Sequence, residues 1–86
     1  MLVDFWADWC EPCKMLDVIL VELKQLLPEL SILKIDIDQS EELKKNYSMM
    51  SVPVLMLFNK GALLWRMNGF LMAPDLEKKI KELTMQ

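Results

Sequence analysis

Both cysteines of this 86-residue chain lie in the stretch Trp9-Cys10-Glu11-Pro12-Cys13-Lys14. The apolar run 1–7 precedes it and the amphipathic stretch 14–27 follows it, an order that predicts a strand, a tight connection and a helix beginning at Cys10. The first turn of a helix has backbone N–H groups without intrahelical partners, and with the helix dipole they favour an anion. A cysteine placed there loses its proton more readily, and the thiolate is the reactive form.

The two-residue spacing brings the second sulfur within disulfide reach of the first. Pro12 suits the first turn of a helix, where its missing N–H is no loss. Cys10 can then attack a disulfide, and Cys13 can resolve the mixed disulfide that results. A C-x-x-C between a strand and a helix is therefore typical of a redox pair.

Two other uses of the cysteines are weaker. A structural disulfide across so small a loop would constrain the unfolded chain little. Two thiolates alone cannot complete a tetrahedral zinc site, so a metal carrier would need a second subunit. The chain has no histidine, which removes Ser-His-Asp and Cys-His nucleophilic sites and every zinc site that needs imidazole.

Composition limits the remaining classes. A hydrophobic content of 53% indicates a packed globule, and the length predicts a single domain over residues 1–86. The net charge of −3, without a basic cluster, argues against a nucleic-acid-binding surface. No signal peptide is visible and no apolar run approaches the length of a membrane span, so we expect a cytoplasmic protein without a membrane partner.

Hydrophobic periodicity and turn residues predict the order β-α-β-α-β-β-α. The expected strands are 2–6, 31–37, 54–58 and 63–67, the last two joined by a hairpin at Asn59-Lys60-Gly61. The expected helices are 14–27, a short one capped by Asp38 and Glu41 that runs to about Asn46, and a last one that starts at Ala73-Pro74-Asp75. Together they predict an α/β fold: a four-stranded mixed sheet with helices on both faces.

These segments resemble the thioredoxin family over nearly the whole chain. The stretch 3–15 is similar to the family's active-site segment, and 33–38 is similar to its next strand. Val52-Pro53-Val54 resembles its cis-proline loop, and Asn59-Lys60-Gly61 resembles its hairpin. The resemblance implies a thioredoxin-like fold and a thiol–disulfide oxidoreductase with no cofactor beyond its own Cys10–Cys13 disulfide.

The resemblance also implies roles for two charged residues. In thioredoxins the aspartate at the position of Asp4 is buried beneath the second cysteine and helps to move its proton. Lys34 resembles the lysine that neighbours this aspartate. The alternative for both is an ordinary strand residue that points to solvent.

A further group of residues resembles the family's substrate-binding surface. In the family, the cis-proline loop packs against the disulfide, and the backbone before the proline pairs with the substrate chain. Gly69 has the alternative of an ordinary turn, and Met49 and Met50 could add an apolar rim. The residues expected to bind substrate are Trp9, Glu11, Pro12, Val52, Pro53 and Gly69.

Three features depart from the family pattern. Glu11 stands where thioredoxins usually carry glycine, and Asp17-Val18-Ile19 occupies the place of a proline that commonly kinks the helix. The chain begins at what would be the family's second strand. We therefore expect the strand 31–37 to lie at an open sheet edge, which predicts a monomer that dimerises weakly.

The preferred function is reduction or exchange of protein disulfides, with a reductase or another dithiol as electron donor. The main alternative is a binding or scaffold module that keeps the fold but has little turnover. A dimeric metal carrier is the third hypothesis.

Overall fold

The structure is a computed structural model that describes residues 1–46 and 51–84. Its elements are β1 (Leu2–Trp6), α1 (Glu11–Leu26), β2 (Ile32–Asp36), the 3-10 helix η1 (Ile37–Gln39), α2 (Glu41–Asn46), β3 (Val54–Asn59), β4 (Ala62–Asn68) and α3 (Ala73–Thr84). The predicted order of strands and helices is confirmed, with η1 as the one added element.

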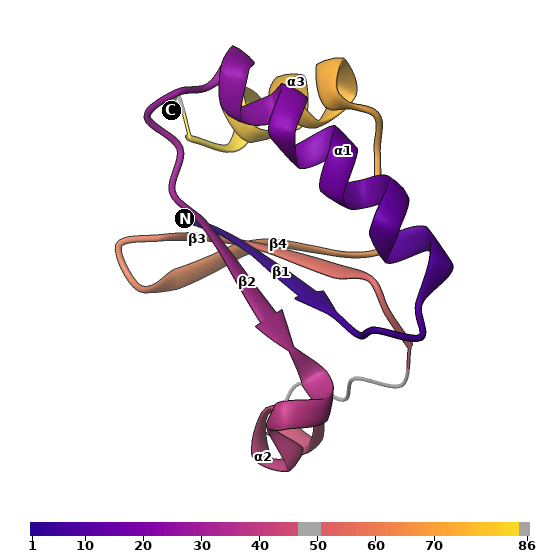
Figure 1. The fold of residues 1–86 in the computed structure, drawn as a ribbon. Coiled ribbons are helices and arrows are strands. Elements are labelled where there is room, and N and C mark those ends of the chain that lie inside the picture. The colour runs from indigo at the N-terminus through magenta and orange to yellow at the C-terminus, as the bar shows by residue number, and fades with distance from the viewer. Residues whose placement is uncertain (47–50, 85–86) are drawn as a thin grey trace.

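The four strands form one mixed sheet in the order β2-β1-β3-β4 (Figure 1). β1 runs parallel to β2 and antiparallel to β3, and β3 pairs with β4 in an antiparallel hairpin. The hairpin turns at Lys60 and Gly61, whose φ angles of 52° and 81° match the Asn-Lys-Gly turn expected from the sequence. The chain thus places β1, the strand that leads to the cysteines, in the middle of the sheet.

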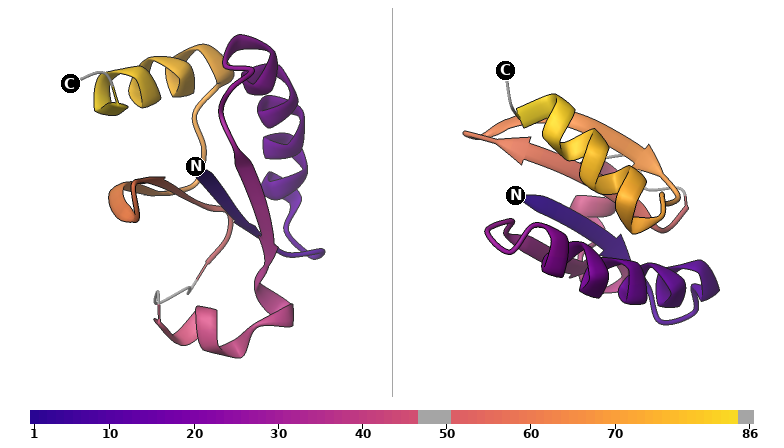
Figure 2. Two further views of the ribbon diagram at one scale, coloured as in Figure 1. Left: turned by 90° about the vertical axis from the view of Figure 1, so that its left-hand side faces the viewer. Right: turned by 90° about the horizontal axis from the view of Figure 1, so that it is seen from above.

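Helices α1 and α3 pack side by side on one face of the sheet, and α2 lies on the other side, beyond the end of β2 (Figures 1 and 2). The buried residues of α1 recur with helical spacing and meet residues of β1, β3 and α3 in one core. Burying each such leucine stabilises the fold by roughly 1.5–3 kcal/mol. The members of this core are Leu2, Leu16, Ile19, Leu20, Leu23, Leu55, Leu57, Ala73, Leu76 and Ile80.

A second buried cluster contains the cysteines. Cys10 and Cys13 pack with apolar side chains from β1, from β3 and from η1. The other members are Val3, Phe5, Ala7, Ile37, Val54 and Met56. This cluster fixes the start of α1 against the carboxyl end of β1.

The sequence-based boundaries were wrong around β2. The strand is shorter than predicted, because the chain turns into η1 at Ile37, and the Asp36 carboxylate caps that turn by accepting the Asp38 N–H at 2.9 Å. Asp38 therefore does not cap α2, which begins at Glu41. Met49 and Met50, the proposed apolar rim, lie outside the described residues. Within the described ranges, none of the helices has the length and apolar character needed to cross a membrane.

Candidate active site

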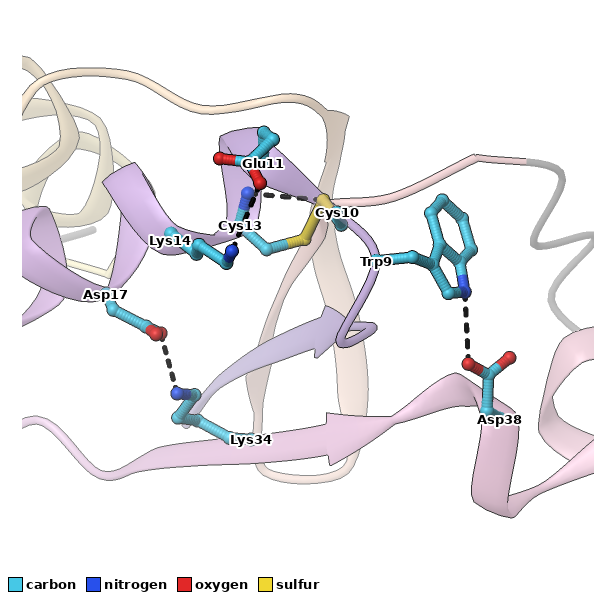
Figure 3. The surroundings of a disulfide bond; sticks show 8 residues. All are labelled: Trp9, Cys10, Glu11, Cys13, Lys14, Asp17, Lys34 and Asp38. Carbon is cyan, nitrogen blue, oxygen red and sulfur yellow. Dashed lines mark hydrogen bonds and ion pairs between the residues drawn. A yellow bond between two sulfur atoms is a disulfide. The ribbon is translucent and has the colours of Figure 1, made fainter.

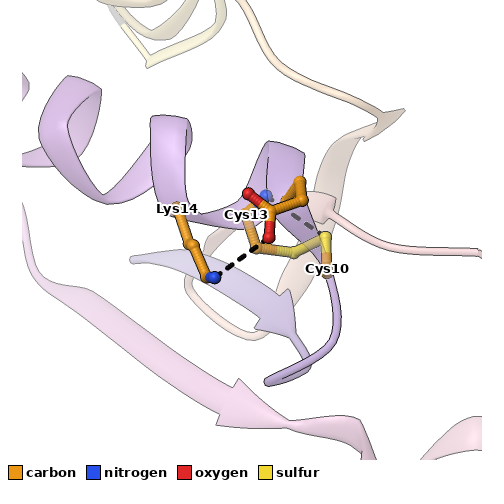
Figure 4. A network of polar contacts seen from close by, with 4 residues as sticks. Cys10, Cys13 and Lys14 are labelled. Atoms are coloured by element: carbon orange, nitrogen blue, oxygen red, sulfur yellow. Dashed lines mark hydrogen bonds and ion pairs between the residues drawn. A yellow bond between two sulfur atoms is a disulfide. The ribbon is translucent and has the colours of Figure 1, made fainter.

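Cys10 and Cys13 form a disulfide at the start of α1, with their Cα atoms 5.3 Å apart (Figure 3). Cys10 is the N-cap of the helix, in an extended conformation with φ −93° and ψ 106°, and a proline lies in the first turn. The Cys10 Sγ accepts a hydrogen bond from the backbone N–H of Cys13 at 3.1 Å (Figure 4). A donor aimed at this sulfur favours its anionic form after reduction.

Exposure does not distinguish the two cysteines. Both residues are 3% exposed in the oxidised protein, so burial alone does not identify which sulfur attacks a substrate. The difference between them lies in their position. Cys10 receives the helix N–H, whereas Cys13 lines a cavity of about 210 Å³ with Trp6, Ala7, Asp8, Lys14 and Asp17.

Glu11 lies between the cysteines on the exposed surface of the first turn. Its carboxylate forms an ion pair with Lys14, with Oε1 and Nζ 3.0 Å apart (Figure 3). Sequence reasoning did not identify this partner, although the two residues are three apart on one helix. The pair partly neutralises the charge that replaces the family's glycine.

Trp9 is 65% exposed beside the disulfide and carries a hydrogen bond to η1. Its Nε1 donates to Oδ2 of Asp38 at 3.0 Å (Figure 3). Asp38 was missed as a site residue because its spacing to Glu41 suggested a helix cap. The contact follows from the parallel pairing of β1 with β2, which brings the end of β2 next to the active-site connection.

Asp4 is buried in the middle of the sheet. It is 0% exposed, so the alternative of a solvent-facing strand residue was wrong. Neither carboxyl oxygen finds a hydrogen-bond partner among the described residues. Burial raises the pKa of Asp4 from 3.8 to about 6, with Lys34 lowering it and Asp17 raising it further. The carboxyl is therefore able to exchange a proton close to neutral pH.

Lys34 lies directly opposite Asp4 in the register of β1 and β2. Its ammonium does not bond to Asp4, however. The Nζ lies 2.6 Å from Oδ1 of Asp17 on α1 and 5.3 Å from the centre of the Trp6 ring. The expected neighbour of the buried aspartate is thus present, but it is paired with Asp17, for which the sequence analysis assigned no partner.

The loop before β3 completes the site. The Val52–Pro53 bond is cis, as expected, and Val52 packs against the cluster that contains both cysteines. The Pro53 carbonyl accepts the Gly69 N–H at 2.8 Å, which joins this loop to the end of β4. Gly69 has a φ of +114°, and a Cβ built there would meet no atom within 4 Å. The positive φ by itself accounts for glycine, so the structure does not separate a turn from a substrate contact.

Residues 1–46 and 51–84 contain no group of three or more His, Cys, Asp or Glu side chains that could hold a metal ion. A metal carrier would still require ligands from a second subunit.

The comparisons with known proteins agree on one family. The family model described as Thioredoxin matches residues 1–82. The thioredoxin of Chlamydia trachomatis is 43% identical over 82 residues, which cover 95% of this chain and 80% of that protein. The thioredoxin of Rickettsia bellii is 45% identical over 62 residues, which cover 71% of this chain and 59% of that protein.

A solved structure of thioredoxin-2 from the malaria parasite is similar with a TM-score of 0.88 at 29% identity, covering 94% of this chain and 80% of that one. The fold, the cysteine pair at the helix start and the matched family model all point the same way. The chain therefore belongs to the thioredoxin family, and its Cys10–Cys13 pair is a thiol–disulfide oxidoreductase site.

Proposed function

We propose that this chain reduces disulfides in other proteins, with Cys10 as the nucleophile and Cys13 as the resolving thiol. The observation that carries this assignment is the hydrogen bond from the Cys13 N–H to the Cys10 Sγ at the N-cap of α1. A reductase or another dithiol supplies the electrons. We place the reaction in a reducing compartment such as the cytoplasm, where substrate disulfides are transient.

The first step forms a mixed disulfide. The Cys10 thiolate attacks one sulfur of a substrate disulfide, a Cys10–substrate S–S bond forms, and the other substrate sulfur leaves as a thiolate that takes a proton from solvent. The N–H at the helix start stabilises the Cys10 thiolate before attack.

The second step releases the substrate. Cys13 gives its thiol proton to the Asp4 carboxylate and attacks the Cys10 sulfur, so the mixed disulfide breaks and the second substrate thiolate departs. Two electrons pass to the substrate, and the chain is left with the Cys10–Cys13 disulfide present in this structure. A buried carboxyl with a pKa of about 6 is suited to accept and return a proton near neutral pH, which supports this role.

The exposed surface around the disulfide binds the substrate in this proposal. Trp9, Glu11 and Pro12 supply its helix side, and the cis-proline loop with Gly69 supplies the other. Two observations support this arrangement: Trp9 is exposed beside the disulfide, and Pro53 and Gly69 are joined by a backbone hydrogen bond. An extended substrate chain can pair with the Val52 backbone there.

Trapping of mixed disulfides tests the assignment. We expect Cys13→Ser to accumulate a covalent complex with a disulfide-containing substrate such as insulin, because the resolving thiol is absent. Cys10→Ser is expected to accumulate none. Trapping by Cys10→Ser alone would reverse the roles, and wild-type insulin reduction no faster than the dithiothreitol background would favour the scaffold alternative.

A further inference from the structure

Three charged groups from three elements converge beside the buried end of the site. Asp4 on β1 and Lys34 on β2 are directly paired, so their side chains project from the same face of the sheet, from strands about 4.8 Å apart. Asp17 comes from α1, which covers that face. The Lys34 ammonium therefore has two possible carboxyl partners, Asp4 and Asp17.

In the structure Lys34 pairs with Asp17. Lys34 Nζ lies 2.6 Å from Asp17 Oδ1, and Figure 3 shows the two side chains pointing toward one another. Both oxygens of Asp4 are left without a hydrogen-bond partner in the described part of the chain. Burying a carboxyl group without a hydrogen bond costs free energy, and the ammonium from the adjacent strand would be the expected partner.

Asp17 also faces the resolving cysteine. It follows Cys13 by four residues, one helical turn, and both line the same cavity of about 210 Å³. The carboxylate that holds Lys34 is therefore part of the immediate surroundings of the sulfur that must lose a proton.

We propose that Asp17 is a positioning residue of the redox reaction, which holds the Lys34 ammonium away from Asp4 and so keeps the buried Asp4 carboxyl unpaired. The proposal rests on the proton-accepting role given to Asp4 above. It assigns a function to Asp17, which the sequence analysis noted only as part of the stretch Asp17-Val18-Ile19 that stands in place of a helix proline.

The charges that face Asp4 act in a defined direction. Lys34 from β2 lowers the pKa of Asp4, Asp17 from α1 raises it, and the facing residue of β3 is the apolar Leu55. Removing the charge of Asp17 ends its repulsion and frees Lys34 to bond to Asp4. Both changes lower the pKa of Asp4, and the second operates only while Lys34 is present.

Titration of the Asp4 carboxyl carbon by NMR in the oxidised protein tests the proposal. We expect Asp17→Asn to lower the pKa of Asp4 by about one, the effect of an opposite charge brought into contact. The pH at which the insulin-reduction rate falls on the acidic side of its pH profile should decrease together with the pKa of Asp4. In a Lys34→Met background, Asp17→Asn should produce a clearly smaller change, because only the direct repulsion is lost.

Control variants separate this proposal from a nonspecific effect of removing a carboxylate. Glu77→Gln breaks a surface ion pair with Lys81 on α3 and should leave the Asp4 titration unchanged. Asp17→Ser repeats the test if the asparagine variant folds poorly. An unchanged pKa after Asp17→Asn, or an equal change with and without Lys34, would overturn the proposal. Failure of Asp4→Asn to slow reduction would instead overturn only the proton-accepting role of Asp4.

Discussion

The two strands that flank β1 contribute different things to the site. β3 presents four consecutive buried apolar residues, Val54 to Leu57, and follows directly from the cis-proline loop. β2 is partly exposed and carries Lys34 and Asp36. The β3 side holds the disulfide and its loop in a fixed geometry, whereas the β2 side supplies charges that set how readily a proton moves.

This difference follows from the position of each strand. β3 lies between β1 and β4, and its side chains enter both cores. β2 is the last strand of the described sheet, and a groove of about 720 Å³ lies between it and α1, lined by Asp17, Leu20, Val21, Lys24, Gln25, Ile32 and Lys34. Side chains next to water can change partners more easily, and Lys34, which could pair with Asp4 or Asp17, is an example.

Truncation of one leucine on each strand should give the largest contrast. Leu55 on β3 is fully buried, so Leu55→Ala should lower the free energy of unfolding by about 2–5 kcal/mol. Leu33 on β2 is 46% exposed, so Leu33→Ala should change it by no more than about 0.5 kcal/mol. Urea denaturation measures both, and similar losses would abolish the distinction between the strands.

Asp4 should make stability depend on pH. Its pKa is raised from 3.8 to about 6 in the folded chain, so folding favours the protonated form. The contribution is fully present below pH 3.8 and is lost as pH rises through about 6. As pH rises from acidic to weakly alkaline values, the free energy of unfolding of Asp4→Asn should therefore increase by about 3 kcal/mol relative to that of the wild-type protein.

Urea denaturation of both proteins across this range measures the gain. The comparison of the two proteins cancels the titration of the other carboxyl groups. A stability difference that stays constant with pH would mean that Asp4 has an ordinary pKa. The charges on the β2 side would then not shift the pKa of a buried group.

Much of this arrangement could be predicted from the sequence. The helical spacing of apolar residues gave α1 and α3, the hairpin turn gave the β3–β4 pair, and the C-x-x-C at the strand–helix junction gave the redox pair. The contacts of Asp17 and Asp38 were not predicted, because each depends on where side chains of two elements distant in the sequence meet, which periodicity does not indicate. The end of β2 was also missed, since Asp36 caps a 3-10 turn that no periodicity marks.

The exposed edge of β2 predicts weak self-association. The Leu2 N–H donates to the Ser31 carbonyl, so by alternation the backbone groups of Ile32, Lys34 and Asp36 point outward. We expect a monomer that dimerises only at high concentration, because the charges of Lys34 and Asp36 discourage pairing. Leu33→Lys should reduce the dimer seen by sedimentation, and a wild-type chain that stays monomeric throughout would show that this edge is already protected.

The smallest effect is expected at Glu11. Its charge lies in the first turn and competes with the Cys10 thiolate for the same N–H groups. Glu11→Gly should raise the fraction of Cys10 thiolate at neutral pH only slightly, since Glu11 is exposed and paired with Lys14. Thiolate absorbance at low and high salt measures this change. A lower thiolate fraction in the glycine variant at low salt would show that Glu11 does not oppose the anion.

The central claim is that the helix start makes Cys10, and not Cys13, the attacking sulfur. Both are equally buried in the disulfide, so reactivity after reduction is the direct test. The fully reduced wild-type chain should be treated briefly with iodoacetamide near neutral pH and the modified cysteine identified by mass spectrometry. The account predicts that Cys10 is alkylated first and that Cys13 reacts much more slowly; faster alkylation of Cys13 would contradict it.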